Sequence, residues 1–203
     1  KEKNNEIEDF TRLIHQKNFD AVRWKGPQTD TADYSQLSTK VTLSFFDQHS
    51  EKVSFKETRC AFADPNFFEF FSMPIVQGKN HRLLDRADAV VLSQSTAKKY
   101  FGQQDPIGKT LIFNDDKTLT VTGVFKDPGG NTHLKVDLLF STMQISKAIE
   151  STDPYQETAV CYFKIRKDAN VPKLEKALAD EVALHWKPEE WFPGSSYSMH
   201  LQP

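Results

Sequence analysis

Apolar residues recur with two different periods along the chain, and the two periods predict a protein that mixes helices with strands. A spacing of three and four residues, typical of one helical face, opens the chain between residues 4 and 17. The same spacing returns after Asn170, which can cap a helix that carries Pro172 in its first turn. The apolar positions are Ile7, Phe10, Leu13 and Ile14 in the first helix, and Leu174, Ala177, Leu178 and Val182 in the second.

Runs rich in β-branched and aromatic residues, bounded by turn residues, predict strands over much of the remaining chain. Short polar turns at 47–51 and 115–117 separate two pairs of these runs, so each pair predicts a hairpin. The predicted strands cover residues 19–25, 40–46, 52–63, 89–92, 110–114, 118–127, 134–142, 157–167 and 196–203.

A short aromatic segment follows the first hairpin. Asp64 is a good N-cap, Pro65 suits the first helical position and Pro74 blocks continuation, so the pattern predicts a helix over 65–72. This helix carries too many rings for one narrow apolar stripe, so part of its surface is expected to meet a second body. The four rings are Phe67, Phe68, Phe70 and Phe71, and we predict Phe70 and Phe71 as part of a partner surface.

The segment from Tyr100 to Phe113 ends in Gly-Lys-Thr, as a phosphate-binding loop does. That loop needs four residues between its first glycine and the Gly-Lys pair, but five separate Gly102 from Gly108. A phosphate loop also leaves a strand and enters a helix, whereas here a helix over 93–101, capped by Ser93 or Ser95, precedes a strand. We therefore interpret Gly102 as the helix end and residues 105–108 as a turn.

The order of these elements predicts an α+β fold with two subdomains. Residues 1–74 and 132–203 are expected to form a βαβ-type sandwich built from both chain ends. Residues 75–131 are expected to form an inserted β-rich subdomain with one helix.

Composition narrows the class of protein. The 203 residues are 38% hydrophobic and 27% charged, which is typical of a globular domain with a real core. The formal charge is only −2, so nothing in the overall charge favours nucleic acid as a partner. No apolar run approaches the length of about 18 residues that spans a bilayer. Because the chain begins on lysine, we expect it to be cut from a longer protein.

The sequence offers few candidates for catalytic, metal-binding or cofactor-binding residues. The six histidines are scattered, and neither they nor Cys60 and Cys161 show the spacing of metal ligands, so we predict no metal, no cofactor and no catalytic residue. Both cysteines are interpreted as buried thiols, with a disulfide as the alternative in an oxidising compartment. Trp186, Trp191 and Phe192 cluster in a loop bounded by proline and glycine, where they would suit a partner surface; the alternative is that they cover the end of the preceding helix.

Residues 63–142 resemble the MacB-like periplasmic core domain of ABC transporter permeases, a family that includes the FtsX-like permeases. The resemblance lies in the order Asp-Pro-x-Phe-Phe, Ala-Lys-x-Tyr-Phe-Gly, Asp-Pro-Ile-Gly-Lys, Val-x-Gly-Val and Asn-Thr-His-Leu. The matching residues are Asp64, Pro65, Phe67, Phe68, Tyr100, Phe101, Gly102, Asp105, Pro106, Gly108, Lys109, Gly123, Asn131 and His133.

The resemblance implies a domain at the periplasmic face of the bacterial inner membrane, held between two transmembrane helices of a permease. It also implies a cytoplasmic ABC ATPase, a second permease protomer and a periplasmic adaptor as partners, with ATP bound at a separate subunit or domain. The function expected from it is transmission of an ATP-driven conformational change to a periplasmic substrate or partner, in efflux or in lipoprotein or peptide export. The alternative is a module that senses an extracytoplasmic ligand and signals through the membrane without transport.

Overall fold

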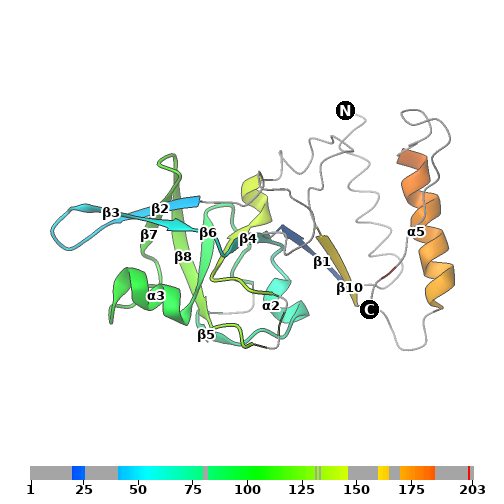
Figure 1. The fold of residues 1–203 in the computed structure, drawn as a ribbon, viewed down its shortest axis with the longest axis horizontal. Helices are drawn as coiled ribbons and strands as arrows, with labels where there is room; N and C mark the ends of the chain where they lie inside the picture. The colour runs from blue at the N-terminus through cyan, green and yellow to red at the C-terminus, as the bar shows by residue number, and fades with distance from the viewer. Residues whose placement is uncertain are drawn as a thin grey trace. The chain divides into compact units, whose positions relative to one another are not determined.

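The computed structural model describes residues 20–25, 41–79, 82–130, 132, 134–145, 160–164, 170–185 and 201 (Figure 1). The chain divides into two compact units. The first contains residues 1–21, 150–157 and 163–203, and the second contains residues 22–149 and 158–162. Each unit is considered by itself below.

One mixed sheet organises the second unit. Its strand order is β10-β1-β4-β9-β6-β8-β7-β2-β3, and β5 pairs with one end of β8. The pairs β4–β9 and β6–β8 are parallel, whereas β1–β4, β6–β9, β7–β8, β2–β7 and β2–β3 are antiparallel. The strands are β1 (Asp20–Lys25), β2 (Val41–Phe46), β3 (Lys52–Glu57), β4 (Cys60–Ala63), β5 (Ile75–Gln77), β6 (Ala89–Ser93), β7 (Thr110–Phe113), β8 (Lys117–Phe125), β9 (Leu138–Ser141) and β10 (Val160–Lys164). The α+β fold class predicted from the sequence is confirmed.

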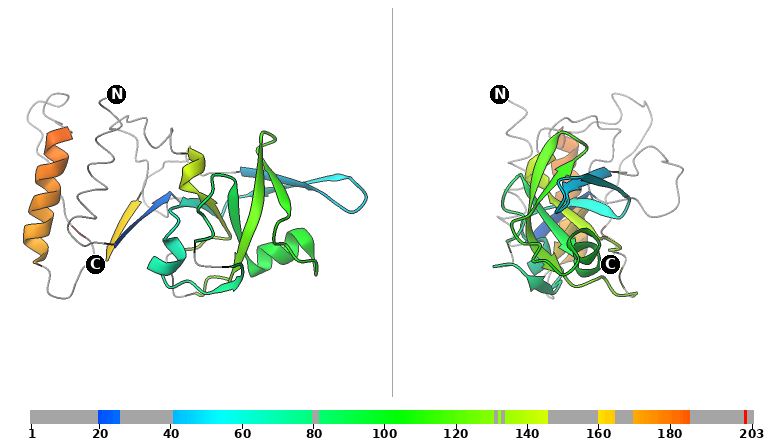
Figure 2. Two further views of the ribbon diagram at one scale, coloured as in Figure 1. Left: turned by 180° about the vertical axis from the view of Figure 1, so that it is seen from behind. Right: turned by 90° about the vertical axis from the view of Figure 1, so that its left-hand side faces the viewer.

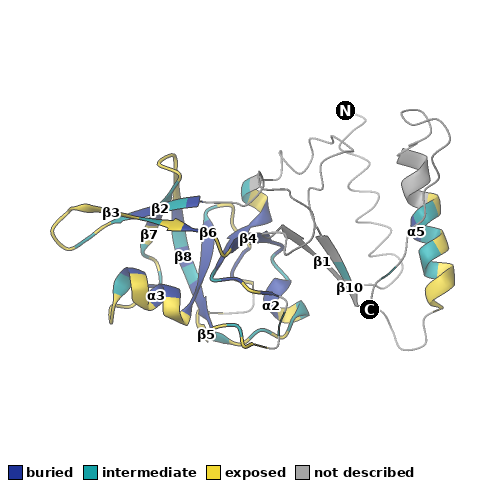
Figure 3. Ribbon diagram, viewed as in Figure 1, coloured by how far each residue is buried: buried dark blue, intermediate teal, exposed yellow. Residues whose placement is uncertain are grey.

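The central strands are buried on both faces, as Figure 3 shows for β4 and β6. Every residue of β9 is buried as well. Alternate residues of these strands enter two separate apolar clusters: Ala61 and Val91 belong to one, Phe62 and Leu92 to the other. Helix α2 (Phe67–Phe70) packs on the first cluster, and helix α3 (Gln94–Phe101) packs on the second. Among the described residues, each face of the sheet is therefore packed against one α-helix, α2 on one side and α3 on the other.

Both predicted hairpins are present. Strands β2 and β3 pair along their whole length, from Val41 opposite Glu57 to Phe46 opposite Lys52, and the hairpin extends outward from the sheet (Figures 1 and 2). Strands β7 and β8 join at Asn114 and Asp115, which both have positive φ, 48° and 59°. Two successive positive φ values are typical of a tight hairpin turn.

The first unit contributes helix α5 (Val171–His185) to the described structure. The Asn170 side chain accepts a hydrogen bond from the Lys173 N–H at 3.0 Å, so the predicted N-cap is confirmed. The predicted helix at 4–17 lies outside the described residues, as do the predicted strand at 196–203 apart from Leu201, and Asn131, His133, Trp186, Trp191 and Phe192.

Three predicted details differ from the structure. The strand expected over 52–63 is two strands, since the chain leaves β3 at Glu57 and enters the sheet again as β4, between β1 and β9. The helix expected over 65–72 is shorter: α2 runs from Phe67 to Phe70 with Asn66 at its N-cap position, and the Asp64 carboxylate accepts a hydrogen bond from Thr142 Oγ1 at 2.7 Å. The unit bounds also differ from those predicted at 74/75 and 131/132, because strands from both predicted subdomains pair in one sheet.

Candidate functional site

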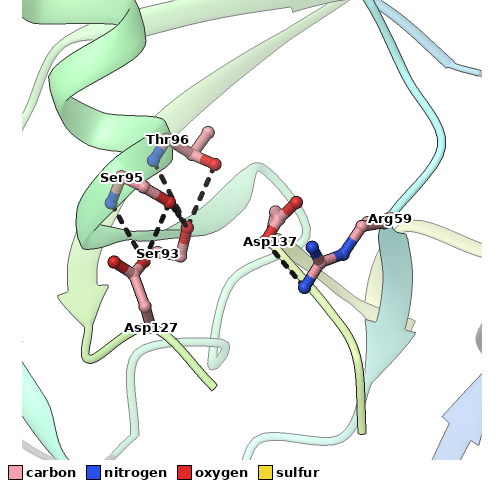
Figure 4. Close-up of polar contacts among 6 residues, drawn as sticks. All are labelled: Arg59, Ser93, Ser95, Thr96, Asp127 and Asp137. Carbon is pink, nitrogen blue, oxygen red and sulfur yellow. Dashed lines mark hydrogen bonds and ion pairs between the residues drawn. The ribbon is translucent and has the colours of Figure 1, made fainter. Parts of the chain in front are cut away.

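Helix α3 is tied to the sheet at its first turn. The Ser93 hydroxyl, at the end of β6, accepts a hydrogen bond from the Thr96 N–H at 3.3 Å. From the loop after β8, the Asp127 carboxylate accepts hydrogen bonds from the Ser95 N–H at 3.0 Å and the Ser95 hydroxyl at 2.9 Å (Figure 4). Two strands therefore fix the start of one helix, and a carboxylate there also meets the positive end of the helix dipole.

A second carboxylate lies near this cap. Asp137, just before β9, forms an ion pair with Arg59 at 3.3 Å between Oδ1 and Nη2 (Figure 4). The pKa of the two acids shifts in opposite directions. Desolvation raises the pKa of Asp137; the charge of Arg59 opposes this rise, and the charges of Glu57 and Asp127 add to it. At Asp127 desolvation is outweighed by the hydrogen bonds from Ser95, so its pKa lies below the usual range.

These opposite shifts predict opposite pH dependences for two substitutions. A lowered folded pKa gives stability that is present above the unfolded pKa of about 3.9 and is lost as pH falls through the folded pKa. Asp127→Ala should therefore lower the free energy of unfolding at pH 7 by about 0.5–2 kcal/mol, the range of a lost helix cap, and by less towards pH 3. Asp137 has a raised pKa, so its ionised form is the disfavoured one and Asp137→Asn should cost little at pH 7.

Urea unfolding of both variants at pH 7 and pH 3 measures these costs. A cost at Asp127 that stays constant between the two pH values would contradict the role of its charge at the helix start. An Asp137→Asn cost at pH 7 larger than that of Asp127→Ala would show that the ion pair with Arg59 outweighs desolvation.

The other end of α3 is tied to β3 through a buried acid. One oxygen of Glu57 accepts hydrogen bonds from Lys99 Nζ and from the Tyr100 hydroxyl, each at 2.7 Å. Lys99 Nζ also lies 4.5 Å from the centre of the Phe55 ring. Burial raises the pKa of Tyr100 above its usual range and raises the pKa of the neighbouring Cys60 thiol to about 12. Both groups stay protonated near neutral pH, so this cluster fits a structural tie between helix and hairpin.

The segment with the Gly-Lys-Thr sequence is a turn, as predicted. The Ile107 N–H donates to the Asp105 carboxylate at 3.0 Å, and the Lys109 N–H donates to the Pro106 carbonyl at 3.1 Å. Gly102 and Gly108 have φ values of 61° and 79°, which L-residues with side chains adopt rarely. Helix α3 precedes the turn and β7 follows it, the reverse of the order at a phosphate-binding loop.

A groove lies between the β2–β3 hairpin and the corner formed by α3 and β7. We call it the β2–β7 groove; its volume is about 790 Å³. Aromatic and aliphatic side chains form much of its wall, and hydroxyls, amides and two oppositely charged groups form the rest. Its lining residues are Phe45, Phe46, Asp47, Gln48, His49, Tyr100, Phe101, Gln104, Gly108, Lys109, Thr110, Ile112 and Thr118.

Many of the described family-motif residues gather in two places. Tyr100, Phe101, Gly108 and Lys109 line the β2–β7 groove, and Asp105 and Pro106 form the turn beside it. Phe67 and Phe68 are fully buried under the opposite face of the sheet.

The aromatic partner surface expected at Phe70 and Phe71 of α2 stays a prediction. Phe70 and Phe71 are half-buried against the core, and the Phe71 ring lies 5.1 Å from that of Tyr162.

The groove residues that sequence reasoning missed, Phe45 and Phe46, are adjacent apolar residues in a predicted strand; on a two-sided strand one of them must face away from the core.

No arrangement for metal chemistry is present in the described part of the chain. Groups of three or more histidine, cysteine or acidic side chains able to hold a metal ion are absent from these residues. Likewise, none of the described helices is long and apolar enough to cross a membrane. The side chain of Cys161 lies outside the described residues, so the pairing of Cys60 with Cys161 stays untested.

Known proteins share this sequence pattern and fold. The model of the MacB-like periplasmic core domain matches residues 4–181. The macrolide export ATP-binding/permease proteins MacB of Neisseria meningitidis and Neisseria gonorrhoeae are each 28% identical over 137 residues, which is 64% of this chain and 21% of theirs. The match thus spans about a fifth of the length of these curated relatives.

Two solved structures share the fold. A domain assigned to a permease protein from Porphyromonas gingivalis matches with a TM-score of 0.60 and 18% identity, over 93% of this chain and 94% of that one. The periplasmic region of MacB from Actinobacillus actinomycetemcomitans matches with a TM-score of 0.51 and 18% identity, over 87% of this chain and 94% of that one. At such identities the likeness shows the fold.

Proposed function

Because the chain belongs to the family of MacB-like periplasmic core domains, we propose that it transmits an ATP-driven conformational change from an ABC transporter permease to a periplasmic substrate or partner protein. The transport served is efflux or the export of lipoproteins or peptides. ATP is hydrolysed at a cytoplasmic ABC ATPase, so this domain needs no cofactor and no catalytic residue of its own. A second permease protomer and a periplasmic adaptor are its further partners.

The observation that carries this proposal is the attachment of α3 at both ends. Ser93 and Asp127 hold its first turn, and Glu57 holds its last turn to β3. The parallel and antiparallel strands between these points form one sheet with apolar clusters on both faces. We expect a unit built in this way to move as one rigid body, which is what transmission over a distance requires.

Crosslinking in the intact permease tests the proposal. Single cysteines are placed at exposed positions, for example Val76→Cys and Ser54→Cys, in a parent permease that carries Cys60→Ala and Cys161→Ala. Where two such cysteines form a disulfide between protomers, transport is expected to stop, and reduction of the disulfide is expected to restore it. Variants whose cysteines do not crosslink serve as controls under the same oxidant. Transport that continues at the full rate in the crosslinked permease would contradict transmission by this domain.

A sensing module is the second candidate, and the β2–β7 groove favours it. Its volume lies within the range of about 300–1,000 Å³ that ligand pockets occupy. A permease whose ATPase is inactivated distinguishes the two functions. A sensing module would still respond to its ligand, whereas a domain that transmits ATP-driven motion would no longer support transport.

A further inference from the structure

The pairing of β2 with β7 stops where the β2–β7 groove begins. The two strands are paired at Leu43 with Phe113 and at Ser44 with Ile112, and the register ends there. Beyond this point the hairpin extends outward from the sheet (Figure 1). The groove is thus the space between two strands of the same sheet that separate.

The register determines which backbone groups face this space. The Thr42 carbonyl accepts a hydrogen bond from the Asn114 N–H at 2.8 Å, and Ser44 lies opposite Ile112. In an antiparallel ladder every second residue turns its N–H and C=O to the same neighbour. The next residues on the two facing edges are therefore Phe46 and Thr110, which are not paired with each other. Such edges accept an added strand.

The side chains around the groove suit an apolar residue. Phe46 is 61% exposed, although it follows five β2 residues that are buried or half-buried. The Phe45 ring lies 5.6 Å from that of Tyr100 and 5.9 Å from that of Phe101, so three packed aromatic rings line the groove beside Phe46. An exposed phenylalanine beside ordered rings is typical of a surface that a partner covers.

The two charged side chains of the groove, Asp47 and Lys109, differ in how well their charges are already partnered. The Asp47 carboxylate already accepts hydrogen bonds from the backbone N–H groups of His49 and Glu51, at 2.8 and 2.9 Å. Lys109 Nζ instead donates to the neutral Gln104 amide at 2.7 Å, and no carboxylate of the described residues forms an ion pair with it. Within the described residues this positive charge has no carboxylate partner, and its other neighbour is the Phe101 ring, whose centre lies 5.7 Å from Nζ. A carboxylate brought by a partner would therefore suit it.

We propose that the β2–β7 groove binds an extended segment of a partner polypeptide, which pairs with the edges at Phe46 and Thr110 and brings an apolar side chain to Phe46 and a carboxylate to Lys109. The proposal rests on the proposed function, since a periplasmic partner protein supplies the segment. It names the surface of contact and the chemistry of the partner.

A displayed library of random nine-residue peptides, selected against the 203-residue chain, tests the proposal. Enriched peptides are expected to share an apolar residue and an acidic residue a few positions apart. Phe46→Ser should weaken their binding at least tenfold, and Met143→Ser, which removes an apolar side chain that is 50% exposed outside the groove, should not. Thr110→Pro, which deletes an edge N–H that does not face β8, should weaken binding as Phe46→Ser does. Circular dichroism checks that each variant folds.

The charge is tested by reversal. Selection against Lys109→Glu is expected to enrich basic peptides in place of acidic ones, while the control Lys126→Glu, an exposed lysine outside the groove, keeps the acidic preference. Failure to enrich any peptide, or enriched peptides that bind Phe46→Ser and Lys109→Glu as well as the unchanged chain, would overturn the proposal. Protection of Phe46 by dodecyl maltoside without peptide enrichment would also overturn it, in favour of a small amphiphile. These assays do not depend on transport, so the crosslinking result is unaffected by their outcome.

Discussion

Replacing Phe68 by alanine is expected to lower the free energy of unfolding of the chain by about 3–5 kcal/mol. Phe68 is fully buried, and its ring lies 5.5 Å from that of Phe67 and 5.9 Å from that of Phe125 at the end of β8. Removing the ring leaves a cavity between α2 and the sheet that the surrounding strands cannot fill. Because small domains are stable by only about 5–15 kcal/mol, this one change would remove a large share of the total.

Urea unfolding followed by circular dichroism measures the loss. Phe46→Ala is the matched control, since the same ring is 61% exposed there and its removal should change stability by less than about 0.5 kcal/mol. Equal effects at the two positions would show that α2 does not hold the first apolar cluster together.

A methyl group at Gly123 is expected to lower the free energy of unfolding by about 1–3 kcal/mol, the cost of overpacking a filled core. A Cβ at this position in β8 would overlap the Leu83 side chain and lie 3.2 Å from the Gln77 carbonyl oxygen. Leu83 cannot simply turn aside, because it also packs over Gly78, where a Cβ would come within 2.8 Å of it. One leucine thus fills the space that two glycines leave open.

A double-mutant cycle identifies the cause of this cost. Gly123→Ala should be less costly in a Leu83→Ala background than alone, with an interaction free energy of about 1 kcal/mol or more. Gly129→Ala, at a glycine with no atom within 4 Å of its added Cβ, should be close to neutral. If the cost of Gly123→Ala were the same with and without Leu83, the overlap would not be its source.

Local signals predicted the local structure well. The sequence predicted Asn170 as one cap and either Ser93 or Ser95 as the other, and Asn170 and Ser93 accept the expected backbone hydrogen bond. The turn at 105–108 followed from proline and glycine chemistry in the same way. These features depend on residues only two to four positions apart, so the sequence around each of them was enough.

Contacts between residues far apart in the sequence could not be predicted from local patterns. The division at 74/75 and 131/132 separated strands that pair directly, because no short-range signal shows that β9 lies between β4 and β6. Glu57 and Asp127 carry no local sequence signal of their role, because they hold α3 across separations of 43 and 32 residues. The groove depends on where β2 and β7 stop pairing, and residue types alone do not set that point.

The parallel pairing of β4 with β9 has a consequence for how the chain folds as it crosses a membrane. Cys60 pairs with Leu138, and Val90 of the intervening β6 pairs with Phe140, so the middle of the sheet closes only when its latest strand arrives. Pairings between residues this far apart form slowly, because a long stretch of chain must be ordered first. While β9 is still being delivered, the facing edges of β4 and β6 stay open to wrong partners.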